Sequence, residues 1–248
     1  MDRALRRLAI CISVVELAVL VRYYVPLLCN VPWFDLEHVD AKQYDDSFVS
    51  DLLFNNRIYR MVVSVLVALQ LGICSFFVIQ LNQNQRRAWC CLPVMGVELF
   101  MLTLAWLGWI VVTAVYLDSE GHMTVGHITG AGLFITACGL YFLLMMVNVL
   151  FLYPNKWSMR EWLLFGLATL CFVSSVVVGC IFAASFFTKA IRFGWAFEHA
   201  AFILFVAAHI CLFIVDGWLE EDLKTNDGVG APRSGFGGVR IHRADVGY

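Results

Sequence analysis

Ionisable side chains lie inside long apolar segments of this 248-residue chain, where charged groups are costly and usually functional. Glu16, Glu98 and His209 each lie well inside such a segment, and Asp216 lies near the end of the segment that contains His209. Such groups usually face the interior of a helix bundle, line a polar cavity or bond to one another. They are therefore the first candidates for chemistry.

The last apolar segment places three ionisable residues on one face of a predicted helix. Glu198 precedes His209 by eleven residues, and Asp216 follows His209 by seven. At about 100° per residue, both offsets return to within about 20° of one direction. This stripe predicts either the lining of a polar cleft or the packed inner seam of a bundle helix.

A second polar stripe recurs every seven residues in another apolar segment. Its members are His127, Phe134, Tyr141 and Asn148. Gly130 and Gly139 in that segment predict close approach of a neighbouring helix. His127 and Glu198 open their segments at the same membrane face, so they form a polar mouth for a lipid headgroup if the two helices adjoin. The alternative is that His127 caps its helix and bonds to the preceding loop. The candidate polar cleft consists of His127, Tyr141, Glu198, His209, Asp216 and Glu98.

The same residues do not predict a catalytic, metal or cofactor site. His199 and His209 point about 80° apart on a helix. His209 is the only histidine in the middle of a predicted span, so a two-histidine haem site is difficult to assemble. Ser174 and Ser175 have no histidine in their segment and no Gly-x-Ser-Gly motif, which disfavours serine-type hydrolysis. We therefore expect no cofactor and no metal, and we favour a protein that is not an enzyme.

These residues must be positioned by membrane-spanning helices. Hydrophobic residues make up 61% of the chain and the mean hydropathy is +0.78, well above the values of a soluble domain. Six apolar segments are long enough to cross a hydrocarbon core, which takes about 20 helical residues. The predicted spans are Leu8–Leu28, Ile58–Leu81, Cys91–Leu117, His127–Tyr153, Trp162–Phe187 and Ala196–Trp218. The sequence predicts an all-α, polytopic six-helix bundle over residues 1–219.

Basic residues predict the orientation of this bundle. Eleven of the 17 Lys and Arg residues fall on the side that carries both termini. Because positive charge marks the cytoplasmic side, we expect both termini in the cytoplasm. A net charge of −2 argues against a nucleic-acid partner.

Three regions outside the spans carry further predictions. The loop 30–57 is acidic and aromatic, and we interpret it either as a cover or partner contact or as a plain connector. Residues 220–248 are predicted to form a flexible, Gly-rich cytoplasmic tail. Cys90 and Cys91 lie beside basic residues, where cysteines are either palmitoylated or ordinary interfacial residues.

The segment GWIVVTAVYLDSEGHMTVGHITGAGLFITACGLY, residues 108–141, resembles the damage-regulated autophagy modulator family of six-span membrane proteins. That family includes relatives that remodel the lipids of GPI anchors. The matching positions are Gly108, Val112, Asp118, His127, Gly130, Ala131, Phe134, Gly139 and Tyr141, with Glu198 and Asp216 in the last span. The Pro-aromatic-Ile-Ser-Asp element of the family is absent from the loop 30–57.

The resemblance implies a lipid-handling, GPI-lipid-remodelling or autophagy-regulating protein of the Golgi, ER, lysosome or plasma membrane, with membrane lipids as its partners. It implies no catalytic residue. An alternative function is a non-catalytic accessory subunit of a larger membrane complex, with other membrane subunits as partners. The arginine-rich start resembles a mitochondrial presequence, so the mitochondrial inner membrane is the alternative location.

Overall fold

The computed structural model describes residues 3–30, 57–84, 94–114, 125–152, 157–188 and 194–229. Within these ranges the chain contains helices and no strand, which confirms the all-α prediction. The helices are α1 (Arg3–Asn30), α3 (Arg57–Asn84), α4 (Val94–Ala114), α5 (Val125–Leu152), α6 (Met159–Thr188) and α7 (Gly194–Val229).

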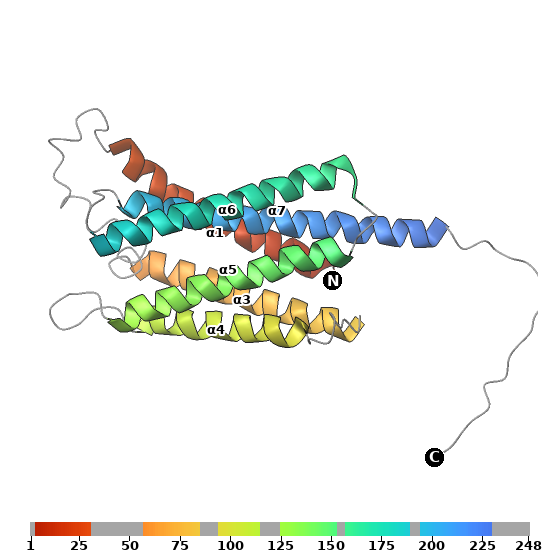
Figure 1. Cartoon of the computed structure of the whole chain (residues 1–248), viewed down its shortest axis with the longest axis horizontal. Coiled ribbons are helices and arrows are strands. Elements are labelled where there is room, and N and C mark those ends of the chain that lie inside the picture. The colour runs from red at the N-terminus through yellow and green to blue at the C-terminus, as the bar shows by residue number, and fades with distance from the viewer. Residues whose placement is uncertain are drawn as a thin grey trace, which may run out of the picture.

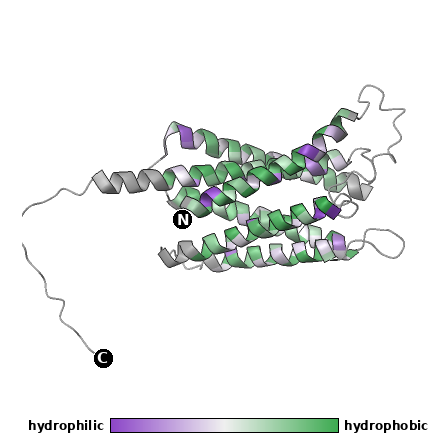
Figure 2. Cartoon of the chain, turned by 180° about the vertical axis from the view of Figure 1, so that it is seen from behind, coloured by the Kyte–Doolittle hydropathy of each residue, from purple (hydrophilic) through white to green (hydrophobic). Residues whose placement is uncertain are grey.

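Each of these six helices is long and apolar enough to cross a membrane. Their most apolar windows have mean hydropathies between 1.9 and 2.5. Hydrophobic residues run along the helices, and hydrophilic ones gather mainly near the helix ends (Figure 2). In α6 only 11% of the most apolar window is buried within the chain. Apolar surface of this extent is stable in contact with lipid and not with water, so the chain is an integral, multi-pass membrane protein.

Successive helices run in alternating directions, so the N-terminus and the end of α7 lie at the same end of the bundle (Figure 1). We call this the terminal end and the other one the far end. Helix α7 packs against α6 and α1, α1 packs against α3, and α3 against α4, which pairs with α5. The backbones of α5 and α7 come close at few points, and the two helices meet through side chains such as Phe142 and His209. Phe142 from α5 and Leu212 and Phe213 from α7 are nearly or fully buried in the core.

Helices α4 and α5 meet through glycine residues. A Cβ atom on Gly108 would lie 2.5 Å from the Phe134 amide nitrogen and 2.8 Å from the Gly130 carbonyl oxygen. A Cβ atom on Gly130 would lie 2.8 Å from the Val111 side chain. The predicted close approach at Gly130 is therefore confirmed. The same prediction for Gly139 is wrong, because a Cβ atom there would meet nothing within 4 Å.

The helices differ from the predicted spans mainly at their ends. Helix α7 continues to Val229, whereas the sequence analysis ended the span at Trp218 and predicted a flexible tail from residue 220. Hydropathy marks the bilayer crossing, while residues such as Glu220, Glu221 and Lys224 favour continuation of a helix. Residues 31–56, Cys90, Cys91 and residues 230–248 lie outside the described ranges.

Candidate functional site

All six residues of the candidate polar cleft are buried, but they lie in separate environments. Their placement shows which of the two interpretations of each stripe fits the packing.

His127 lies against α4. Its Nδ1 atom is 3.1 Å from the carbonyl oxygen of Val112. Because a carbonyl oxygen only accepts, Nδ1 carries the hydrogen and donates it. His127 therefore ties α5 to α4 at the far end of the bundle, in keeping with a structural role.

Glu198 lies at the start of α7 in a different environment. It interacts electrostatically with the Tyr59 hydroxyl of α3, and so does Glu16 of α1. The Tyr59 ring meets the Tyr23 ring edge-on, with centroids 4.6 Å apart. Helix α5, which carries His127, pairs mainly with α4 and meets α7 through side chains such as Phe142. The polar mouth formed by His127 and Glu198 stays a prediction.

His209 lies among aromatic rings in the bundle core. Its ring centroid is 4.5 Å from that of Phe142 and 4.6 Å from that of Phe205. Its Nδ1 atom lies 3.2 Å from the Phe205 carbonyl oxygen of its own helix. These contacts make the middle of α7 a packed seam, as one of the two interpretations predicted.

The other stripe, on α5, also faces protein. Tyr141 is buried beside the Cys74 thiol of α3. Asn148 donates a hydrogen bond from Nδ2 to the Glu98 carboxylate of α4. The amide of Asn148 on the neighbouring helix thus supplies a polar partner for the Glu98 carboxylate.

Asp216 forms a buried ion pair with Arg6 of α1 at the terminal end. Arg6 Nη2 donates to Asp216 Oδ2 over 3.0 Å, and the two side chains are only 7% and 8% exposed. Arg6 reaches Asp216 by crossing Gly217, where a Cβ atom would lie 3.1 Å from the Arg6 Cδ atom. Glycine at position 217 therefore makes room for the arginine to lie across α7.

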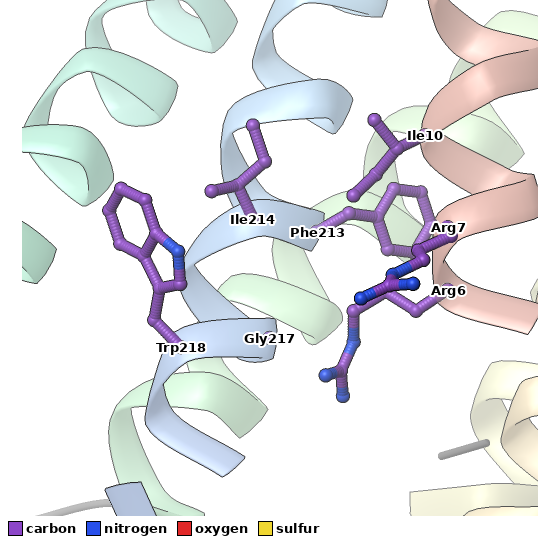
Figure 3. A pocket seen from close by; sticks show the side chains of 7 residues that line it. All are labelled: Arg6, Arg7, Ile10, Phe213, Ile214, Gly217 and Trp218. Atoms are coloured by element: carbon purple, nitrogen blue, oxygen red, sulfur yellow. The ribbon is translucent and has the colours of Figure 1, made fainter. Parts of the chain in front are cut away.

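A groove of about 290 Å³ opens beside this ion pair, between α1 and α7 (Figure 3). Helix α1 contributes Arg6, Arg7 and Ile10 to its lining, and α7 contributes Phe213, Ile214, Gly217 and Trp218. In Figure 3 the two arginine side chains reach from α1 towards α7. The groove thus combines guanidinium groups with apolar and aromatic walls.

Helix α6 holds Trp218, which lines the groove, from the side that faces away from α1. The Arg160 guanidinium lies over the Trp218 ring, 4.1 Å from its centroid, in a cation–π contact. Arg160 also bonds to the Glu161 carboxylate over 2.7 Å, and that carboxylate accepts a hydrogen bond from the Ser158 amide over 2.9 Å. Ser158 and Glu161 form a capping box that starts α6.

Two of these features escaped the sequence analysis although the sequence carries a signal for each. Ser158-x-x-Glu161 ahead of an apolar run is the pattern of a capping box. Arg6 lies just before the first predicted span and Asp216 just before the end of the last one, so two opposite charges lie near the same membrane face and favour a pair. Within the described ranges, no group of three His, Cys, Asp or Glu residues lies close enough to hold a metal ion.

Comparison of the chain with protein-family models, curated proteins and solved structures finds no match. The geometry of the site is therefore the basis for assigning a function.

Proposed function

We propose that this chain is a membrane-embedded lipid-binding protein, in the class of lipid-handling factors that the family resemblance implies. The observation that carries the proposal is the groove between α1 and α7, which joins a basic edge to apolar and aromatic walls. A phospholipid has the complementary chemistry, because its phosphate is negatively charged and its acyl chains are apolar. We propose no catalytic step at this groove.

The size of the groove fits one part of a lipid. Pockets that enclose a drug-sized ligand have volumes of about 300–1,000 Å³. At about 290 Å³ the groove admits a headgroup and its glycerol backbone. The acyl chains would then continue along the apolar outer surface of the helices.

The depth of the groove in the membrane also supports a lipid ligand. Arg7 lies three residues inside the candidate span Ala4–Pro26, and Trp218 lies next to the last residue of the span Gly194–Leu219. Arginine and tryptophan at span ends lie at the level of the headgroups. The groove is thus at the right depth for a lipid to enter sideways from the bilayer.

To test the proposal, the full chain is purified in a mild detergent, and the lipid molecules that it retains are counted by mass spectrometry. Ile10→Trp fills the groove, and we expect it to lower the retained lipid by about one molecule per chain. Ile214→Trp fills the groove from the opposite wall and should act in the same way. Thermal unfolding of both variants checks that they fold.

Val15→Trp is the matched control. Val15 is exposed on the same helix but is turned by about 140° from Ile10, so it faces away from the groove. Equal lipid retention by the wild type, Ile10→Trp, Ile214→Trp and Val15→Trp would contradict the proposed function.

A second candidate function is an accessory subunit of a membrane complex, and the exposure of α6 favours it. This helix packs mainly on α7. It leaves a row of large apolar side chains exposed: Leu163, Leu167, Leu170, Val173 and Val177. Co-purification of another protein at a fixed ratio, lost when Leu167 and Leu170 are changed to Trp, would support this function. A chain that purifies alone would argue against it.

A further inference from the structure

We infer that the α1–α7 groove selects lipids with a net negative headgroup, and that Arg7 is the residue that contacts the phosphate. The inference rests on the proposed function and adds the chemical class of the ligand. It follows from the different surroundings of the three arginines near the groove.

Two of these arginines already have acidic partners. Arg6 bonds to Asp216, and Arg160 bonds to Glu161. In each pair the carboxylate balances the charge of the guanidinium. Neither arginine leaves a net positive charge for a ligand.

Arg7 differs from both. It lines the groove, its side chain is exposed, and the part of the chain that the structure describes gives it no acidic partner. Among the side chains that the structure describes, the unbalanced charge at the groove is therefore that of the Arg7 guanidinium. A guanidinium donates two parallel hydrogen bonds to a phosphate group, which makes arginine a preferred phosphate ligand.

The ion pair at Asp216 positions this site. By crossing Gly217 to reach Asp216, Arg6 holds α1 against α7 at the residue next to Arg7. The phosphate then lies near Arg7, and the glycerol backbone and the first methylene groups lie between Ile10 and Trp218.

The predicted orientation of the chain agrees with an anionic ligand. The terminal end holds most of the basic residues and is expected to face the cytoplasm. Anionic phospholipids are concentrated in the cytoplasmic leaflet, and one basic residue near its surface contributes about a fivefold preference for them.

The test uses the full chain in vesicles of equal parts phosphatidylcholine and phosphatidylglycerol, followed by extraction and mass spectrometry of the retained lipid. We expect the wild type to enrich phosphatidylglycerol about fivefold and Arg7→Gln to lose that enrichment. Arg7→Lys should retain part of it. Arg22→Gln removes an exposed arginine from the same helix at the far end and should leave the enrichment unchanged.

The other outcomes separate this inference from the proposed function. If the wild type retains lipid without a headgroup preference and Ile10→Trp loses that lipid, the inference is overturned and the proposed function stands. Lipid retention that does not respond to Ile10→Trp would overturn both. Displacement of phosphatidylglycerol by millimolar inorganic phosphate would identify a site for free anions and overturn the lipid assignment.

Discussion

Arg6 and Asp216 are both buried, and each balances the charge of the other across 3.0 Å. We predict that Arg6→Met or Asp216→Asn alone lowers the free energy of unfolding by about 3–5 kcal/mol, because each leaves a buried charge unpaired. The double variant Arg6→Met/Asp216→Leu should cost clearly less than the sum. Unfolding in mixed micelles measures these values.

Arg160→Gln serves as the control for the buried ion pair, because it breaks the Arg160–Glu161 pair, in which the arginine side chain is 56% exposed. A loss of about 1 kcal/mol or less is expected there. Additive effects of the two substitutions at Arg6 and Asp216 would show that the ion pair is not a unit.

The bond between Asn148 and Glu98 leads to a second prediction at this scale. Glu98→Gln keeps an oxygen that accepts from Asn148, so its stability should stay close to that of the wild type. Glu98→Leu removes the acceptor and should cost about 0.6–2 kcal/mol, the range of hydrogen bonds between membrane helices. Equal stability of the two variants in thermal unfolding would contradict a hydrogen bond between α4 and α5.

Burial of the six candidate polar residues follows from the sequence, because a charged or polar group is costly in hydrocarbon. Their partners do not follow from the same argument. A stripe on one helix gives a direction but does not identify the helix that it faces. The sequence predicted a polar mouth from His127 and Glu198 only if α5 and α7 adjoin, and it did not identify the Val112 carbonyl of α4 as the partner of His127.

Helix α5 packs on α4 because two glycines let the backbones touch. We predict that Gly108→Ala destabilises the protein by about 1–3 kcal/mol, because the new methyl group overlaps the α5 backbone and forces the two helices to shift apart. Gly130→Ala should destabilise it as well. Gly132→Ala is the control, since a Cβ atom at that position would meet nothing within 4 Å and alanine favours a helix.

Thermal unfolding of these three variants in one detergent checks the prediction. A Gly108→Ala protein as stable as Gly132→Ala would mean that α4 and α5 do not meet at this point.

The spans themselves could be predicted, because about 20 consecutive apolar residues have few stable alternatives to a membrane helix. The length of α7 could not. Its last turns beyond Leu219 lie past the candidate span, where hydropathy carries no information on whether the helix continues. The pairing of α4 with α5 depended on Gly108, which hydropathy treats like any other small residue.

At the scale of the whole molecule, both ends of the described bundle lie on one side, and the basic residues predict that this side is cytoplasmic (Figure 1). We expect a protease-cleavable tag after Tyr248 to be removed only from the cytoplasmic side of sealed vesicles of known orientation. A tag placed in the loop 30–57 should be protected in the same vesicles. Removal of the Tyr248 tag from the exoplasmic side would reverse the assignment of the groove to the cytoplasmic leaflet.

The most direct test of lipid binding is a density map of the full chain in nanodiscs that contain phosphatidylcholine and phosphatidylglycerol. We predict an elongated density in the α1–α7 groove, with its compact end against Arg7 and its chains leaving past Ile10 and Ile214. Annular lipids resolved elsewhere in the same map provide the reference for occupancy. A groove closed by its own side chains, in a map that resolves those annular lipids, would contradict the proposed function.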